Sequence, residues 1–415
     1  MDHPKMKYTY VGIDSHKDSH TAVFLDCFFE KLGEIRFTNL PSDFTGFLDD
    51  ALKLQAPETT LLFGMEDISH YGRTLMVFLR NQAQAVKHVN ALLVARERKN
   101  RSITQKTDSV DAECAARVLL SKFSELPDAE PYDKYYILRT LVMRRGFIVH
   151  NKTSLVNHLH ALLTPHYPNY RKWFPEIDSM ASLAFFARYP SPATLIGTTV
   201  EELGAFLTEA ALGRVGAGKR GIDKARIILD DLYDTSVPFQ EIRDGAVRST
   251  VKQIKAGLKE IQQIEAAIEK FMEQFDCTLT SMTGISVIVA AQLLSCIGDI
   301  RKFPTPAKLA QYSGIAPVTY ASGKTDRQYA NKRGNRELNS IFYLLAVRMI
   351  PAPRNRIVNS FFHEYYHRKI SEGKTKIQAL KCVQRRLVSI VWRMLTYNEE
   401  YKNPPVIDKP EEDMV

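Results

Sequence analysis

The chain has 415 residues, a net charge of +9 and 45% hydrophobic residues, so it is long enough for two or three domains with buried cores. It contains no run of about 18 apolar residues and no apolar leader, so we expect neither a transmembrane helix nor a membrane partner. Its five cysteines are scattered without zinc or disulfide spacing, as is typical of a protein of the reducing cytosol.

Residues 1–124 read as strands alternating with helices. Strands are predicted at Tyr8–Asp14, which is apolar on both faces toward its end, at His20–Cys27 and Gly33–Thr38, which follow at hairpin distance, and at Thr59–Met65 and Ala85–Asn90. Helices are predicted from Pro41, over Tyr71–Gln82 and over Asp108–Ser121. The order is three strands joined as hairpins and then two crossovers through helices, which is that of a ribonuclease H-like (RuvC-like) mixed sheet.

Residues 125–277 form a predicted helical linker region. Residues 135–163 read as one long helix, and residues 191–234 read as irregular. Over residues 247–272, apolar side chains recur at alternating spacings of four and three, interrupted by Glu265. That spacing fits a coiled-coil seam between subunits, and it fits equally well a helix packed against residues 135–163 within one subunit.

Residues 278–400 form a predicted, mostly helical C-terminal domain. Gly284-Ile285-Ser286 precedes the apolar helix Val287–Ile297 and partly matches a helix-hairpin-helix, whose turn amides bind DNA phosphates. Lys376–Leu395 reads as a helix with an apolar stripe. Residues 401–415 are rich in proline and acidic side chains, which predicts a disordered tail.

Positive charge is concentrated near the end of the chain. Between Arg301 and Glu400 there are 19 lysines and arginines against 6 aspartates and glutamates. Such a basic region either faces a polyanion or is a solvated surface without a partner. Because aromatic residues are interleaved with the basic ones, we favour nucleic acid as the partner.

Four acidic residues stand at the ends of predicted elements in the first domain. Asp14 ends the first strand, Glu66 follows the fourth, and a helix opens with Asp108 and Asp111. Neighbouring strands would bring Asp14 and Glu66 to one edge of the sheet. A spacing of three places the other two on one helix face. Carboxylates grouped in this way can hold two Mg²⁺ ions about 4 Å apart for phosphodiester cleavage.

Each of these residues has an ordinary alternative role, as when an aspartate such as Asp108 caps its helix. Four of them in a matching order of elements favour a metal site over separate structural roles. For His16 and Lys17, which follow the first strand, we favour a solvated surface position over a metal or phosphate role. His70 and Tyr71 are candidates for positions near the substrate.

Several motifs are shared with one known family. They are Tyr10-Val11-Gly12-Ile13-Asp14, Met65-Glu66 with Tyr71, Lys106-Thr107-Asp108-Ser109-Val110-Asp111-Ala112, Leu309-Ala310-Gln311-Tyr312-Ser313-Gly314-Ile315-Ala316-Pro317, Ser322-Gly323 and Lys332-Arg333-Gly334-Asn335-Arg336-Glu337-Leu338. In combination they make the chain resemble the DEDD-type insertion-sequence transposases related to the Piv DNA invertase, which are recombinases guided by a bridge RNA. The resemblance covers residues 7–120 and 278–395.

The resemblance implies a chemistry, a set of partners and a location. A RuvC-like domain would bind Mg²⁺ through the acidic tetrad Asp14, Glu66, Asp108 and Asp111. In the C-terminal transposase domain, Ser322 would attack DNA and become covalently joined to it. A structured noncoding RNA would pair with donor and target DNA. The protein would act as a homo-oligomer, a dimer or tetramer with sites shared between subunits, in the bacterial cytoplasm at the nucleoid.

On residues alone, the case for Ser322 depends on its setting. Gly323 would let the backbone approach a phosphate closely. The nearest histidine in sequence is His363, so activation by a metal rather than by a local base is expected. The alternatives are that this segment is only a turn, or that Ser313 is the nucleophile. Candidate phosphate contacts are the basic residues that follow: Lys324, Arg327, Lys332, Arg333 and Arg336.

These observations predict a transposase or DNA recombinase of a mobile element. One rival is a RuvC-like nuclease that hydrolyses DNA with water, in which Ser322→Ala would leave activity unchanged. A second rival is a nonenzymatic nucleic-acid-binding protein with a decayed nuclease fold, against which the intact acidic tetrad argues.

Overall fold

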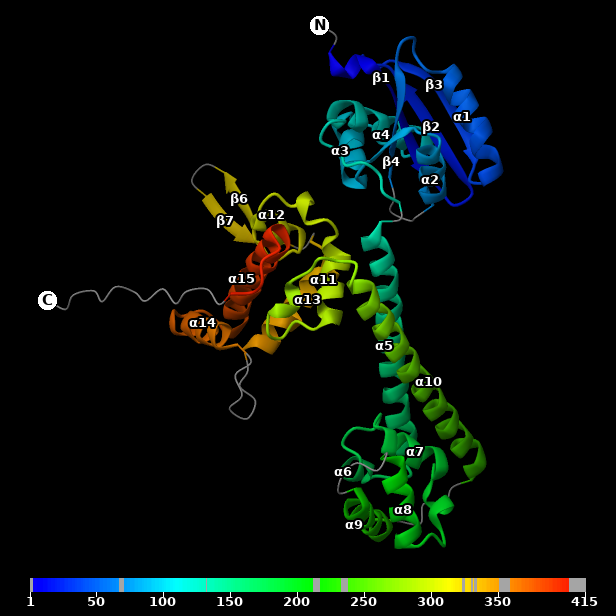
Figure 1. Ribbon diagram of the computed structural model, residues 1–415, viewed down its shortest axis with the longest axis vertical. Helices are drawn as coiled ribbons and strands as arrows, with labels where there is room; N and C mark the ends of the chain where they lie inside the picture. The colour runs from blue at the N-terminus through cyan, green and yellow to red at the C-terminus, as the bar shows by residue number, and fades with distance from the viewer. Residues whose placement is uncertain are drawn as a thin grey trace, which may run out of the picture. The chain divides into compact units, whose positions relative to one another are not determined.

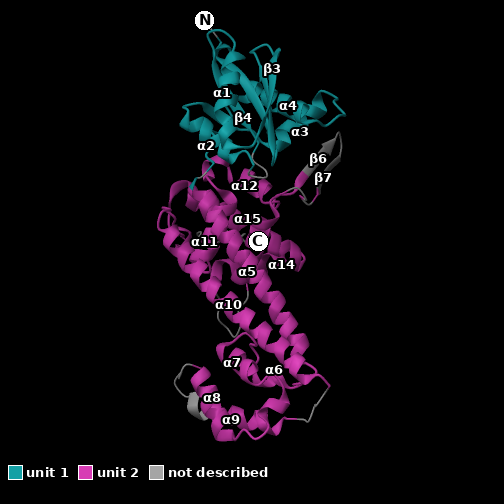
Figure 2. Cartoon of the chain, turned by 90° about the vertical axis from the view of Figure 1, so that its right-hand side faces the viewer, with its two compact units in different colours: residues 1–133 teal, residues 134–415 magenta. Residues whose placement is uncertain are grey.

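The computed structural model describes residues 3–66, 71–131, 133–211, 217–232, 238–322, 325–329, 331, 334–350 and 359–402, of which 217–219, 319–322 and 325–328 are described by their backbone alone. The chain divides into two units, residues 1–133 and residues 134–415 (Figure 2). Among the described residues, no helix combines the length and the apolar character needed to cross a membrane.

The first unit is built on a five-stranded mixed sheet in the order β3-β2-β1-β4-β5 (Figure 1). The antiparallel pairs β1–β2 and β2–β3 form hairpins, and β4 and β5 continue the sheet in parallel with β1. This topology confirms the predicted ribonuclease H-like sheet. The strands are β1 Tyr8–Ser15, β2 Ser19–Leu25, β3 Lys31–Thr38, β4 Thr60–Met65 and β5 Ala85–His88.

Helices cover both faces of this sheet (Figure 1). The predicted helices are present, and one more, α3, lies between β5 and α4, where the sequence had indicated none. The helical elements of this unit are η1 Pro4–Lys7, η2 Pro41–Asp43, α1 Phe44–Lys53, α2 Arg73–Asn81, α3 Ala91–Asn100 and α4 Asp108–Lys122.

The alternation of side chains along β1 separates the two cores and sets the direction of Asp14. Val11 and Ile13 belong to the core shared with α1 and α2, whereas Tyr10 belongs to the core shared with α3 and α4. Because successive side chains of a strand point to opposite faces, Asp14 shares the face of Tyr10. Asp14 therefore lies on the side of the sheet that carries α4.

The backbones of β1 and α4 touch at Gly12. A Cβ added there would lie 2.8 Å from Ala116 Cα, and closer still to Ala116 N and to Ala112 O. Only glycine permits this approach, so its absence of a side chain sets how close the start of α4 comes to the end of β1.

Two long helices, α5 Lys134–Leu163 and α10 Gln240–Met272, pack side by side in the second unit (Figure 1). Glu265, which interrupts the apolar repeat of α10, pairs with Arg145 of α5 at 2.6 Å. Leu138 and Ile268 share one core, which shows that the apolar sides of the two helices meet. Of the two arrangements that the repeat allows, the structure shows packing within the chain.

Shorter helices close a core at each end of this pair. The core that contains Leu159 and Val251 is completed by helices of residues 170–230, so the expectation that residues 191–234 are irregular is wrong. A capping box between Thr199 and Glu202 starts α8 there. The elements are α6 Tyr170–Trp173, α7 Met180–Arg188, η3 Pro192–Leu195, α8 Val200–Ala210 and α9 Ala217–Asp230.

Where it is described, the C-terminal part of the second unit is largely helical, as predicted, and it also contains a β-hairpin. The hairpin pairs β6 Val318–Ser322 with β7 Thr325–Tyr329 in antiparallel fashion. The Gly284 turn has a positive φ of 98° and leads into α11. The helical elements are η4 Leu279–Ser281, α11 Val287–Ile297, η5 Ile300–Lys302, α12 Pro306–Tyr312, α13 Arg336–Met349, α14 Ser360–Ser371 and α15 Lys376–Tyr397. The predicted tail lies outside the described residues from position 403 onward.

Candidate active site

Two of the acidic residues meet at the carboxyl ends of β1 and β4. Ile13 pairs with Met65 in the parallel register, and each is followed directly by an acidic residue. Asp14 and Glu66 therefore stand at the same level of two adjacent strands. Both are only partly exposed, and the predicted meeting of these two residues at one edge of the sheet is observed.

The other two acidic residues lie in the first turn of α4. Thr107 is the N-cap, and its side chain accepts a hydrogen bond from Val110 N at 3.3 Å. Asp108 is therefore not the capping residue, which removes the ordinary alternative considered for it. Since the helix is capped by Thr107, its N-cap hydrogen bond uses neither the Asp108 nor the Asp111 carboxylate.

All four acidic residues line one pocket of about 540 Å³ in the first unit. Its wall combines the ends of β1 and β4 with α3 and the start of α4. Tyr71 belongs to this wall, while His70 lies outside the described residues. The lining residues are Asp14, Ser15, His16, Glu66, Tyr71, Ala91, Val94, Ala95, Arg98, Lys106, Thr107, Asp108 and Asp111.

A histidine bridges two of these carboxylates. His16 Nε2 lies 3.1 Å from Asp14 Oδ2 and 3.2 Å from Asp108 Oδ1. The imidazole is 51% exposed, so His16 lies at the surface as predicted from the sequence, yet it also belongs to the acidic site. The strand end and the helix start are thus joined through one side chain.

Two arginines pair with the carboxylates of α4. Arg36 Nη2 of β3 lies 2.8 Å from Asp108 Oδ2, and Arg98 of α3 forms an ion pair with Asp111. Neither arginine was singled out from the sequence. The signal for α3 was Asn90, whose side chain accepts a hydrogen bond from Leu92 N and starts the helix that carries Arg98.

The pocket holds its carboxylates in a crowded, partly buried setting. Burial raises the pKa of Asp14 above its ordinary 3.8, with His16 opposing the shift and Asp111 adding to it. Burial also raises the pKa of Glu66, and the charges of Asp14 and Asp111 add to that shift. A cation placed among these groups would offset both the burial and the mutual repulsion.

Three of the predicted residues of the C-terminal domain, Ser322, Arg327 and Arg336, lie in described elements. Ser322 ends β6 and pairs with Thr325, so its backbone stands next to the hairpin turn. Arg327 lies in β7 opposite Tyr320, and Arg336 is the first residue of α13. Three further candidates lie outside the described residues: Lys324, Lys332 and Arg333.

The rival serine is enclosed. Ser313 is fully buried, and its Oγ donates a hydrogen bond to Ala310 O at 3.1 Å. The segment after the hairpin packs against it, since a Cβ on Gly334 would lie 2.9 Å from the carbonyl carbon of Ser313. Asn339 Nδ2 also donates to Ser313 O at 2.9 Å. These contacts give Ser313 a structural role at the base of the hairpin.

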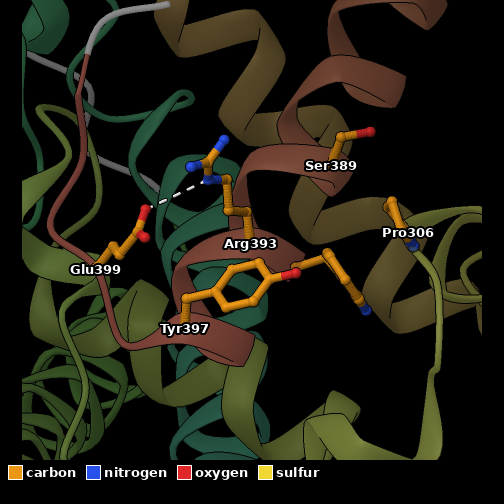
Figure 3. A pocket seen from close by; sticks show the side chains of 6 residues that line it. Pro306, Ser389, Arg393, Tyr397 and Glu399 are labelled. Carbon is orange, nitrogen blue, oxygen red and sulfur yellow. Dashed lines mark hydrogen bonds and ion pairs between the residues drawn. The ribbon is translucent and has the colours of Figure 1, made fainter.

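A second pocket, of about 430 Å³, lies in the C-terminal part of the second unit (Figure 3). Arg393 Nε lies 3.3 Å from Glu399 Oε2 across it, and the exposed ring of Tyr397 forms part of its wall. Glu399 is the single carboxylate among its lining residues. This pocket therefore lacks the grouped carboxylates that a metal-dependent nuclease requires.

Two family models match the chain. Residues 11–168 match a DEDD-type model described as a transposase, and residues 277–366 match a model described as a transposase of the IS116/IS110/IS902 family. The first match contains all four acidic residues of the pocket, and the second contains Ser322 and the basic segment after it.

Several relatives run along nearly the whole chain. An uncharacterized 44.8 kDa protein of insertion element IS116 from Streptomyces clavuligerus is 26% identical over 398 residues, 93% of this chain and 94% of its own. An uncharacterized 43.6 kDa protein of insertion element IS110 from Streptomyces coelicolor is 28% identical over 408 residues, 95% of each chain. The pilin gene-inverting protein of Moraxella bovis is 28% identical over 130 residues, 30% of this chain and 37% of its own. With the acidic pocket inside one family match and the hairpin inside the other, the chain belongs to the IS116/IS110/IS902 family of DEDD transposases.

Proposed function

We propose that this transposase cuts and rejoins DNA through a covalent serine–DNA intermediate. The observation that carries the proposal is the gathering of four carboxylates in one pocket at the edge of a ribonuclease H-like sheet. The position of Ser322 at a hairpin turn, with the rival Ser313 buried, supports the choice of nucleophile.

The pocket fits divalent cations that prefer oxygen ligands. Asp14, Glu66, Asp108 and Asp111 supply carboxylates from three elements, and burial already makes two of them less stable as free anions. When bound, Mg²⁺ would supply positive charge that polarises a phosphate and eases the deprotonation of an attacking hydroxyl. The arginines and His16 would have to release carboxylate oxygens for the ion.

The proposed reaction has two transfers. First, Ser322 Oγ loses its proton and bonds to the phosphorus of a phosphodiester, while the bond from phosphorus to one DNA oxygen breaks and that oxygen takes up a proton. Second, a hydroxyl of a different DNA end attacks the serine-linked phosphorus, and Ser322 leaves as the free alcohol. One phosphoester bond is exchanged at each step, so neither step needs ATP.

The proposed partners are donor DNA, target DNA and a noncoding guide RNA. The support is the basic excess between Arg301 and Glu400, together with the family resemblance. Phosphate contacts are proposed for the basic residues that follow Ser322 in the sequence: Lys324, Arg327, Lys332, Arg333 and Arg336.

A covalent-trapping assay tests the proposal. Purified protein, its flanking noncoding RNA and end-labelled donor DNA are mixed with Mg²⁺ and separated on a denaturing gel. We expect a protein–DNA adduct that is absent with Ser322→Ala and absent with Asp14→Ala. Omitting the RNA should remove the adduct as well if the RNA guides the reaction.

The rival hydrolytic nuclease predicts a different gel. It would yield cut DNA without an adduct, and Ser322→Ala would cut as well as the wild type. That result would reject the serine intermediate and leave metal-dependent hydrolysis by the acidic pocket as the activity.

A homo-oligomer is proposed because joining two duplexes requires four strand transfers. If the acidic tetrad of one subunit acts with Ser322 of another, a mixture of Asp14→Ala and Ser322→Ala proteins should form the adduct, although neither variant does so alone. Failure of the mixture, with oligomers present by light scattering, would assign both groups to one chain.

A further inference from the structure

We propose that His16 is a nitrogen ligand of the metal ion bound in the acidic pocket. The proposal rests on the proposed function, because it adds one ligand to the set of carboxylates that the same pocket offers. It also reverses the surface role that the sequence favoured for this histidine.

The donor atoms already have the spacing of ligands around a single ion. His16 Nε2 lies 3.1 Å from Asp14 Oδ2 and 3.2 Å from Asp108 Oδ1, and the three side chains offer atoms that all lie within 4.8 Å of one another. Adjacent ligands of an octahedral ion with bonds of about 2.1 Å are about 3.0 Å apart. An ion can therefore be met by all three without a rearrangement of the backbone.

One hydrogen bond accounts for only part of this arrangement. His16 Nε2 is within hydrogen-bond distance of Asp14 Oδ2, at 3.1 Å, but Nε2 carries at most one hydrogen, and that hydrogen cannot also point well at Asp108. Asp108 already has a full positive charge beside it in Arg36, at 2.8 Å. The lone pair of a neutral His16 Nε2 and one carboxylate oxygen each of Asp14 and Asp108 could bind the same cation placed between them.

The turn that carries His16 is held in place. His16 N donates to Ser19 O at 3.1 Å, which closes the turn between β1 and β2. Asn39, at the end of β3, donates from its backbone N to Asp18 O at 3.0 Å and from Nδ2 to Lys17 O at 3.1 Å. A ligand on so constrained a turn loses little freedom when it binds an ion.

A nitrogen ligand changes which ions the pocket prefers. Mg²⁺ and Ca²⁺ favour oxygen ligands, whereas imidazole suits first-row transition ions. A site with His16 beside the carboxylates should bind Mn²⁺ more tightly than Mg²⁺, and replacing His16 should reduce the ratio of the two affinities.

Pulsed electron paramagnetic resonance of the full-length protein loaded with Mn²⁺ tests the assignment directly. We expect modulation from ¹⁴N of a coordinated imidazole, its replacement by ¹⁵N frequencies when histidine is labelled, and its loss in His16→Asn. Asp18→Asn is the matched control, since Asp18 belongs to the same turn but does not line the pocket. His70→Asn is measured in parallel, because His70 lies outside the described residues.

Binding measurements complete the test. Mn²⁺ affinity should fall at least about tenfold in His16→Asn, the lower end of the loss seen when a residue that only orients a ligand is removed. Mg²⁺ affinity should fall less. Nitrogen modulation that persists in His16→Asn, or that is lost in His70→Asn instead, overturns the assignment.

The outcome for His16 can be separated from the outcome for the pocket. Bound Mn²⁺ that is lost in Asp14→Ala but never shows nitrogen modulation would reject His16 as a ligand and leave the proposed function standing. Absence of bound Mn²⁺ from the wild-type protein would reject the metal site and the ligand together.

Discussion

Replacing Gly12 with alanine should move the start of α4 and weaken the acidic site without touching an acidic residue. The added Cβ would lie 2.8 Å from Ala116 Cα and nearer still to Ala112 O, whereas ordinary contacts of a Cβ begin near 3.4 Å. Backbone atoms cannot swing aside as a side chain can, so the helix has to retreat from β1 by about 1 Å.

The size of the effect follows from two costs. Overpacking of this kind destabilises a core by about 1–3 kcal/mol, and we take about 2 kcal/mol here. Asp108 and Asp111 lie in the first turn of α4 and would move with it, and a displacement of about 1 Å in a catalytic group costs roughly a hundredfold in rate. Adduct formation should therefore fall by about a hundredfold in Gly12→Ala.

Hydrogen exchange of the amides of α4, read by mass spectrometry, is the appropriate assay. Both tryptophans, Trp173 and Trp392, lie in the second unit, so tryptophan fluorescence would not report on the first. A loss of about 2 kcal/mol should speed exchange in residues 108–122 by about thirtyfold. Gly46→Ala is the matched control, because its Cβ would meet nothing within 4 Å on α1. Equal exchange and equal adduct yield in the two variants would refute the reasoning.

Three further predictions follow from the same geometry. Because burial raises the pKa values of Asp14 and Glu66, the metal-free protein should lose stability as the pH rises from their ordinary pKa values of 3.8 and 4.5 through the raised values. Mn²⁺ binding should strengthen over the same pH window, so melting temperatures measured with and without Mn²⁺ should change in opposite directions with pH. Parallel changes would contradict the raised pKa values. Arg98→Met should destabilise the metal-free protein by about 1–3 kcal/mol, because the Asp111 side chain is only 14% exposed and loses its ion-pair partner. Adding Mn²⁺ should then raise the melting temperature of the variant by more than it raises that of the wild type, and an equal rise would contradict the pairing. Gly334→Ala should disturb the base of the hairpin and lower the adduct yield by roughly tenfold to a hundredfold, while the Mn²⁺ affinity of the acidic pocket stays unchanged. A loss of Mn²⁺ affinity would show that the effect of the substitution is not confined to the hairpin.

The sheet of the first unit could be predicted because its central strands β1 and β4 are distinct apolar runs and because hairpins and crossovers permit few arrangements. Helix α3 could not, because only Val94 of its residues is buried and the helix carries no wide apolar stripe. Its signal was a single capping residue, Asn90, followed by a segment in which charged residues predominate at the end. The single capping box of Thr199 and Glu202 is a similar sequence signal for α8, a helix that the sequence analysis also missed.

The carboxylates of the site could be predicted, but their cationic partners could not. Asp14 and Glu66 stand at strand ends, where the order of elements alone determines that they meet. Arg36 and Arg98 reach the site from β3 and α3, so their proximity depends on how those elements pack. His16 shows the same limit, since an exposed residue in a turn gives no sequence signal that its ring lies 3.1 Å from a carboxylate.

The central claim is that Ser322 carries the DNA during the reaction, and locating the attachment site tests it most directly. Trypsin should release residues 309–324 as one peptide, which contains both Ser313 and Ser322. After nuclease digestion of the trapped adduct, fragmentation mass spectrometry should place the nucleotide remnant on Ser322. A remnant on Ser313 or on another residue, or cut DNA with no modified peptide, would contradict the account.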